Sequence, residues 1–295
     1  MSASIHPAGP TALTRDDGPG VLVPTSFGDV HVKVDGDPGA AVVAAFVHGL
    51  PGSTRDFAAA GRALAARGGC AVRLDLPGFG RSPTSSSPLL APADRADLVA
   101  AVMQARGHRR YAVVGHSFGG TAALALAGRA ATAGPVSAVG LVASVGITRH
   151  RGLSLPHELT GALAGLHGVP VIGERLAGPL VGRFRETLGR FGIRGDRPFT
   201  DRELVEQAAT VGALDFKDLR QWAAAVRAPV LVISAEDDRI VESDVSFTLA
   251  AALTGAPLVS HHHRRVGGHF LQRKVGAVIA DWLMVVTGEA DAADS

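Results

Sequence analysis

Residues 111–131 read YAVVGHSFGGTAALALAGRAA, a short apolar run followed by a glycine-rich turn and an alanine-rich segment. The run at 111–114 has the length and composition of a buried strand, and the residues after Gly119 predict a helix. Between them, Gly115 to Gly119 form the pattern G-x-S-x-G around Ser117. Such a strand–turn–helix unit needs glycine on both sides of the serine and exposes the hydroxyl at the carboxyl edge of a sheet. Ser117 is therefore the predicted nucleophile; the alternative is a glycine-rich turn with a solvent-exposed serine.

Short apolar runs alternate with helix-like segments along most of the chain. After a hairpin predicted at 21–34, the runs lie at 41–47, 70–74, 111–114, 136–143, 230–234 and 257–260. Helices are predicted between them at 55–67, 93–106, 119–131, 244–253 and 274–286. Strands that alternate with helices indicate an α/β fold, in which a mostly parallel sheet is covered by helices on both faces.

One interval interrupts this alternation. Residues 147–227 carry no strong strand signal but contain helix-like pieces at 156–166 and 201–211. We interpret the interval as a helical cap inserted into a core made of residues 21–146 and 228–288. Residues 1–20 are expected to form a flexible N-terminal segment. The acidic, alanine-rich residues 289–295 are expected to form a disordered tail.

Composition narrows the classes of function. The chain contains 29 Lys and Arg residues and 27 Asp and Glu residues, so its net charge is only +2. This nearly balanced charge gives no indication of a nucleic-acid partner. A single cysteine, Cys70, excludes an internal disulfide and a cysteine metal cage, and we expect a buried, inert thiol. No signal peptide is recognised, and the apolar residues 112–147 are interrupted by Arg129, Gly134 and Pro135, so no membrane span is predicted. A cytoplasmic protein is the expectation.

A serine hydroxyl is a weak nucleophile until a base takes its proton, and 12 histidines are candidates for that role. His48 and His116 each adjoin a glycine turn at a strand end and are interpreted as structural. His261 to His263 are interpreted as a solvated strand end, where neighbouring side chains point to opposite faces and rarely share a metal ion. His269 follows two glycines in a loop after the last strand run, which makes it the predicted general base; the alternative is a structural loop histidine.

The remaining member of a catalytic triad is a buried carboxylate, which fixes the imidazole tautomer and stabilises the imidazolium. The residues Glu236, Asp237 and Asp238 follow the apolar run at 230–234 and supply three candidates. They lie between the serine and the histidine in the chain, the order expected when a nucleophilic serine occupies a strand–helix turn.

Five motifs together resemble the α/β-hydrolase fold family, nearest to its capped esterases, carbon–carbon bond hydrolases and perhydrolase-like enzymes. The motifs are His48-Gly49-Leu50-Pro51-Gly52-Ser53, Asp75-Leu76-Pro77-Gly78-Phe79-Gly80-Arg81-Ser82, Gly115-His116-Ser117-Phe118-Gly119-Gly120, Asp237-Asp238-Arg239-Ile240-Val241 and Gly268-His269-Phe270. The resemblance implies an eight-stranded sheet with the helical cap after the sixth strand. It also implies an oxyanion hole formed by the backbone N–H groups of Leu50 and Phe118.

The resemblance further makes Asp238 the triad acid, as the fourth residue of a turn whose usual first glycine is here Ala235. Asp237 stays an alternative, because the loss of that glycine could shift the turn by one residue. The predicted function is a serine hydrolase that needs no metal or cofactor and forms an acyl-enzyme on Ser117. Its partner is a small-molecule acyl substrate with an ester, lactone, thioester or diketone carbon–carbon bond. A non-hydrolytic small-ligand binder or an accessory protein of the same fold is the alternative.

Arginines are frequent in the predicted cap. They either cover a solvated helical face or include one or two side chains that bind a substrate carboxylate. These residues are Arg183, Arg185, Arg190, Arg194 and Arg197.

Overall fold

A computed structural model describes residues 19–85, 91–129, 136–154, 172–190 and 199–293. Eight strands form one sheet in the order β1-β2-β4-β3-β5-β6-β7-β8. Strand β2 runs antiparallel to both of its neighbours, and the other neighbouring pairs are parallel. The strands are β1 (Val21–Thr25), β2 (Gly28–Asp35), β3 (Val43–Val47), β4 (Cys70–Leu74), β5 (Tyr111–His116), β6 (Val136–Val142), β7 (Val230–Ala235) and β8 (Val259–Arg264). The predicted eight-stranded, mostly parallel sheet is confirmed.

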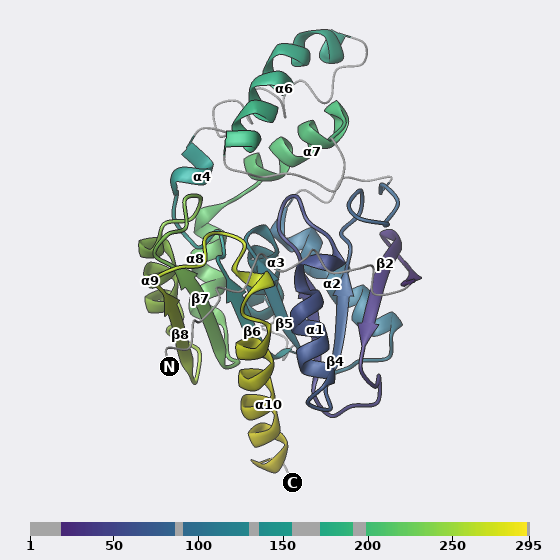
Figure 1. The fold of residues 1–295 in the computed structure, drawn as a ribbon, viewed down its shortest axis with the longest axis vertical. Coiled ribbons are helices and arrows are strands. Elements are labelled where there is room, and N and C mark those ends of the chain that lie inside the picture. The colour runs from purple at the N-terminus through teal and green to yellow at the C-terminus, as the bar shows by residue number, and fades with distance from the viewer. Residues whose placement is uncertain (1–18, 86–90, 130–135, 155–171, 191–198, 294–295) are drawn as a thin grey trace, which may run out of the picture.

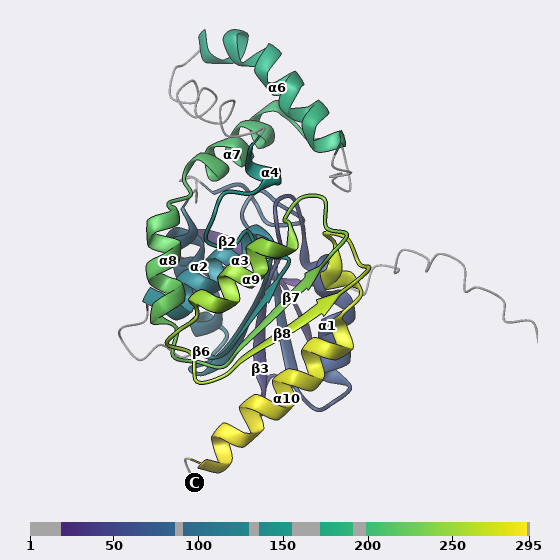
Figure 2. The ribbon, with the colours of Figure 1, turned by 90° about the vertical axis from the view of Figure 1, so that its left-hand side faces the viewer.

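Helices cover both faces of the sheet (Figures 1 and 2). One face carries α1 (Ala58–Ala65) and α10 (Gly276–Ala293), with the short 3-10 helices η1 (Thr54–Phe57) and η2 (Leu271–Arg273) nearby. The other face carries α2 (Pro92–Ala105), α3 (Phe118–Arg129), α8 (Phe216–Ala225) and α9 (Ser243–Ala252). Strands β3, β4, β5 and β7 are buried at every residue, which explains their continuous apolar sequences. No helix within the described ranges is long and apolar enough to cross a bilayer.

Three of the described helices between β6 and β7 lie above the carboxyl edge of the sheet (Figure 1). They are α4 (Arg151–Ser154), α6 (Ile172–Arg190) and α7 (Asp201–Gly212). Helices α6 and α7 share an apolar cluster that includes Phe184 and Leu204. A capping box, in which Thr200 and Glu203 each bond the other's backbone N–H, begins α7. Helices α6 and α7 thus have apolar contacts of their own, in the interval where a cap is expected.

The helices differ from the predicted organisation of the chain at two places. The predicted cap includes residues 216–225, but helix α8 packs against α3 and buries Leu219 and Ala223 in the core on the α3 face of the sheet. Val226, directly after the helix, is buried in the same core. Leu219 and Ala223 lie on one face of α8, so the layer above the sheet ends near Ala213. Helix α10 continues to Ala293, so residues 289–293 are helical rather than a disordered tail. Alanine, the strongest helix former, favours this extension.

Two predicted segments fall outside the described residues. They are the flexible N-terminal segment, apart from residues 19 and 20, and the cap helix predicted at 156–166.

Candidate active site

Ser117 lies in the tight turn between β5 and α3. Its φ of 51° is in the left-handed region, where a residue with a side chain is strained. The turn is held by a hydrogen bond from the Ser117 N–H to the carbonyl of Val142, at 3.0 Å. A Cβ atom on Gly115 would lie 2.2 Å from the carbonyl oxygen of Gly119, and one on Gly119 would lie 2.2 Å from that of Val47. Both glycines are therefore required for strand and helix to approach this closely, as the motif predicts.

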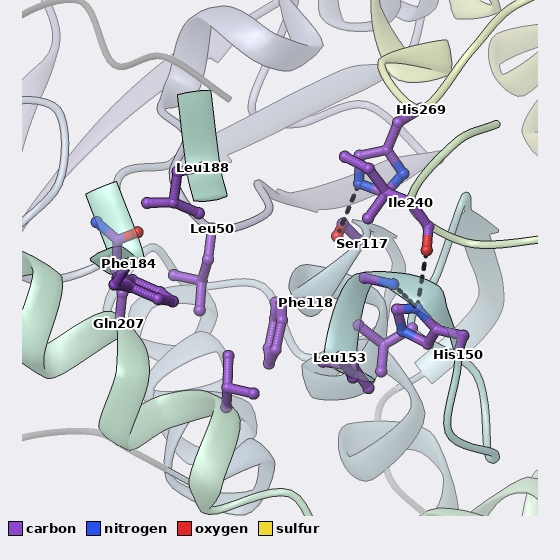
Figure 3. Close-up of a pocket in the computed structure, with 13 residues that line it drawn as sticks. Leu50, Ser117, Phe118, His150, Leu153, Phe184, Leu188, Gln207, Ile240 and His269 are labelled. Carbon is purple, nitrogen blue, oxygen red and sulfur yellow. Dashed lines mark hydrogen bonds between the residues drawn. The ribbon is translucent and has the colours of Figure 1, made fainter. Parts of the chain in front are cut away.

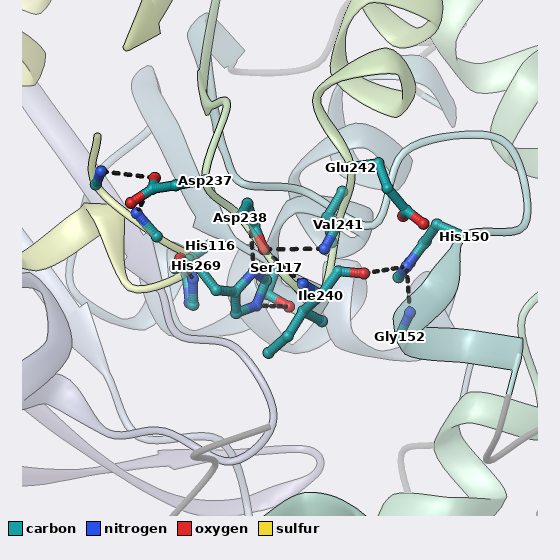
Figure 4. A network of polar contacts seen from close by, with 12 residues as sticks. His116, Ser117, His150, Gly152, Asp237, Asp238, Ile240, Val241, Glu242 and His269 are labelled. Atoms are coloured by element: carbon teal, nitrogen blue, oxygen red, sulfur yellow. Dashed lines mark hydrogen bonds and ion pairs between the residues drawn. The ribbon is translucent and has the colours of Figure 1, made fainter. Parts of the chain in front are cut away.

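Three side chains that are far apart in the sequence form a continuous hydrogen-bonded chain (Figure 4). His269 Nε2 lies 3.1 Å from Ser117 Oγ, and His269 Nδ1 lies 2.9 Å from Asp238 Oδ2. All three side chains belong to buried residues. Because an ionised carboxylate can only accept, Nδ1 carries the proton and Nε2 faces the serine as the acceptor. The chain therefore has the connectivity of a nucleophile, a base and an orienting acid.

The turn after β7 places the carboxylate of Asp238, and not that of Asp237, against the His269 ring. Its Oδ1 accepts the backbone N–H groups of Ile240 and Val241 at 2.8 and 3.0 Å, which leaves Oδ2 for His269. Ala235, which replaces the glycine expected from the family, is the last residue of β7 and is fully accommodated in the core. The substitution does not shift the register of the turn.

Asp237 binds the loop that carries His269 instead of the ring itself (Figure 4). Its Oδ1 accepts the backbone N–H groups of Gly267 and Gly268 at 2.8 and 2.7 Å. The hydrogen bond from Gly268 is the main cause that lowers the pKa of the Asp237 carboxyl. Lys274 adds a hydrogen bond from Nζ to the carbonyl of Gly267, at 2.8 Å. The loop before the candidate base is therefore fixed from two sides.

His48 and His116 are buried neutral rings with structural contacts. His48 donates from Nδ1 to the carbonyl of Gly49 and accepts the N–H of Leu76 at Nε2. His116 donates from Nε2 to the carbonyl of His269, at 2.9 Å. Burial lowers the pKa of both rings, and the proximity of His269 lowers that of His116 further.

A pocket of about 510 Å³, including its opening to solvent, adjoins Ser117 and His269 (Figure 3). No charged side chain of the described residues lines it. The cap helices α4, α6 and α7 contribute part of the wall, so the pocket lies between the sheet edge and the cap. Its apolar lining consists of Leu50, Phe118, Val145, Leu153, Phe184, Leu188, Val211 and Ile240.

Leu50 and Phe118, the residues predicted to form an oxyanion hole, line this pocket together with Ser117. Phe118 is the first residue of α3, where backbone N–H groups have no acceptor within the helix. Leu50 follows β3, the strand that pairs with β5. Leu50 and Phe118 thus both contribute to the wall of the pocket that Ser117 lines.

Polar residues from the insertion also reach the pocket, although no motif marks them in the sequence. They are His150, just before α4, and Gln207 of α7, and both are buried. A sequence pattern could not single them out, because their place depends on how the cap packs on the core.

The cap arginines do not line the pocket where the structure describes them. Arg183, Arg185 and Arg190 are exposed on α6, and Arg185 pairs with Asp201 at 2.5 Å. These three arginines therefore form a solvated helical face and do not bind a substrate carboxylate in this pocket. Arg194 and Arg197 lie outside the described residues.

The three consecutive histidines lie within β8, which runs to Arg264, and not at the end of the strand. His261 and His263 share one face, and both rings lie within 2.9 Å of Ser234 Oγ. In the described part of the chain, no three His, Cys, Asp or Glu side chains form a group that could hold a metal ion. Cys70 is buried, and burial raises the pKa of its thiol to about 11.

Comparisons with known proteins agree with this architecture. The family model for the alpha/beta hydrolase fold matches residues 45–273, whereas no curated protein matches the chain in sequence. A hydrolase from Pseudomonas aeruginosa is 20% identical with a TM-score of 0.67, and the match covers 92% of this chain and 100% of that one. An esterase from Exiguobacterium antarcticum is 15% identical with a TM-score of 0.67, covering 91% and 99%. The carboxylesterase CesB from Bacillus subtilis is 18% identical with a TM-score of 0.62, covering 91% of each chain. Because the family model spans most of the sequence, the chain belongs to the alpha/beta hydrolase fold family.

Proposed function

We propose that the protein is a serine hydrolase that cleaves a small ester, lactone, thioester or diketone carbon–carbon bond. The observation that carries this proposal is the buried chain Ser117–His269–Asp238, which adjoins an apolar pocket. Two of the similar structures are described as an esterase and a carboxylesterase, which supports acyl transfer to water as the reaction class.

The geometry supports a two-step reaction. Ser117 Oγ attacks the substrate carbonyl while His269 Nε2 takes its proton, and the carboxylate of Asp238 stabilises the resulting imidazolium. The imidazolium then protonates the leaving group, and an acyl-enzyme remains on Ser117. Water attacks this ester with His269 again as the base, which releases the acid and restores the serine.

Negative charge develops on the carbonyl oxygen in both steps. The backbone N–H groups of Leu50 and Phe118 would donate to this oxyanion, and the loss of such a donor costs about 3–4 kcal/mol of transition-state stabilisation. These steps need no metal ion or organic cofactor.

Helices α4, α6 and α7 would act as a cap over this chemistry, whereas α8, which the sequence predicts as part of the cap, packs on the core. The apolar side chains of α6 and α7 at the pocket would exclude water and favour uncharged, apolar acyl groups.

The test is a panel of p-nitrophenyl esters with increasing acyl length, assayed beside a meta-cleavage diketone. The wild type should turn over at least one of them, and Ser117→Ala should lose about 10³-fold or more. Thermal melting checks that the variant is folded. If Ser117→Ala keeps more than about a tenth of the activity, the proposed nucleophile is wrong. If no substrate is turned over, the alternative of a ligand-binding or accessory protein is favoured.

A further inference from the structure

Two buried polar side chains of the catalytic pocket each leave one nitrogen atom without a hydrogen-bond partner among the described residues. The atoms are His150 Nε2 and Gln207 Nε2, and the two residues are 7% and 3% exposed. Buried polar groups are nearly always hydrogen-bonded in folded proteins, because leaving one unpaired is unfavourable. Since the rest of the lining is mostly apolar, a bound substrate is the natural source of the missing partners.

The hydrogen bonds of His150 define which of its nitrogens carries the proton. Nδ1 lies 2.9 Å from the carbonyl oxygen of Ile240, and a carbonyl can only accept, so Nδ1 is the donor. The N–H of Gly152 also lies near Nδ1, but it donates to the same Ile240 carbonyl at 2.9 Å and needs no other acceptor. Burial is the main cause that lowers the pKa of His150. The ring is therefore neutral, and Nε2 has a free lone pair.

His150 is tied to the turn that holds the candidate triad acid. The carbonyl of Ile240 fixes the His150 ring, while the N–H of Ile240 donates to Asp238 Oδ1 at 2.8 Å. Figure 3 shows His150 on the same side of the pocket as Ser117 and His269, with Gln207 across the pocket beside Phe184. The acceptor at His150 thus has a fixed position relative to the reacting serine.

We propose that the substrate carries a hydroxyl group on an otherwise apolar, uncharged skeleton, and that His150 Nε2 accepts the hydrogen bond of this hydroxyl. The inference rests on the proposed hydrolase function and adds the substrate class. An ammonium group is a poorer fit, because the described lining contains no carboxylate to pair with it. Gln207 Nε2 would donate to a second oxygen of the substrate on the cap side of the pocket.

The test compares esters with and without a hydroxyl group. On the acyl side, esters of hexanoic acid are compared with esters of its monohydroxy derivatives. On the alcohol side, simple alkyl hexanoates are compared with hydroxyalkyl hexanoates. Titration of the released acid gives kcat/KM for each. The wild type should prefer at least one hydroxylated ester by about tenfold. In His150→Asn the ratio of kcat/KM for the hydroxylated ester to kcat/KM for the plain ester should fall to about one. The asparagine amide can donate to the Ile240 carbonyl as His150 Nδ1 does, but it has no atom at the position of His150 Nε2. His150→Gln, which places an amide near the position of Nε2, should retain part of the ratio.

The matched control is His108→Asn. His108 also has a buried Nε2 without a partner among the described residues, but it precedes β5 at the edge of the sheet opposite the pocket. Its substitution should leave the ratio unchanged. Equal kcat/KM values for all esters in the wild type, or an unchanged ratio in His150→Asn, would overturn the inference about the hydroxyl group. If hydrolysis still depends on Ser117 in that case, the proposed function is still supported. Absence of both hydrolysis and labelling by a fluorophosphonate overturns the proposed function, and this inference with it.

Discussion

The carboxylate of Asp237 accepts the backbone N–H of Gly268 at 2.7 Å, one residue before the candidate base His269. The next residue, Asp238, binds the His269 ring itself. The two adjacent acids after β7 therefore make different contacts. Asp237 holds the loop before His269, and Asp238 binds the imidazole ring, so substitutions at the two positions should have different effects.

Asp238→Asn should reduce kcat by about 10⁴-fold, because an amide at this position permits the wrong imidazole tautomer. Asp237→Asn should cost no more than a few-fold, since its amide oxygen can still accept the N–H groups of Gly267 and Gly268. Asp237→Ala removes both hydrogen bonds, and we expect a loss of about tenfold in kcat through misplacement of His269.

Ester hydrolysis and thermal melting of the three variants check this order. A larger loss in Asp237→Asn than in Asp238→Asn would show that the assignment of the acid is off by one residue.

A second prediction concerns the contact between core and cap. Arg95 of α2 is 4% exposed and donates from Nη2 to Thr210 Oγ1 of α7 at 2.7 Å. Burial lowers the pKa of Arg95 to about 10, so the guanidinium is still charged at neutral pH. Thr210→Val should lower the free energy of unfolding by about 1.5–3 kcal/mol, because it removes an acceptor from a buried charge.

The control is the double-mutant cycle with Arg95→Met, measured by urea unfolding. In the Arg95→Met background no charge is left unpaired, and Thr210→Val should cost less than about 1 kcal/mol. Equal costs in the two backgrounds would show that the hydrogen bond does not stabilise the contact.

The buried histidines predict how stability depends on pH. Burial lowers the pKa of His48, His116 and His150 in the folded protein, whereas a histidine in the unfolded chain has a pKa of about 6.5. Below that pH the unfolded state binds more protons, so the stability present above pH ~6.5 is lost as the pH falls. Each such proton changes the free energy of unfolding by about 1.4 kcal/mol per pH unit.

Urea unfolding between about pH 7.5 and 5 measures this slope. His116→Gln keeps an N–H donor near the position of Nε2 but cannot titrate, so it should reduce the slope by up to one proton. A free energy of unfolding that stays constant or rises as the pH falls below ~6.5 would contradict the assignment of these rings as neutral.

The sheet and the candidate triad could be predicted because their signals are local. The G-x-S-x-G turn requires its glycines for a steric reason that the structure reproduces, and the acid and the histidine each follow a recognisable strand run. Parallel strands bring their carboxyl ends to one edge, so residues that are far apart in the sequence meet there.

The cap was less predictable, since its helices contain residues that interrupt helical patterns. Helix α6 includes Pro179 and the exposed glycines Gly178, Gly182 and Gly189, which obscure its apolar face. The placement of α8 on the core depends on contacts with α3, which no local pattern reports. The role of Asp237 was missed for the same reason, because its partners lie 30 and 31 residues later in a loop.

The central claim is that Ser117 is an activated nucleophile, and covalent labelling with a fluorophosphonate tests it most directly. Intact-mass spectrometry followed by peptide mapping should find one adduct per wild-type chain, on the peptide that contains Ser117. His269→Ala should slow labelling strongly, because the hydroxyl at 3.1 Å loses its base. Ser117→Ala should give no adduct. An adduct on a different residue, or labelling of Ser117→Ala at the wild-type rate, would contradict the account.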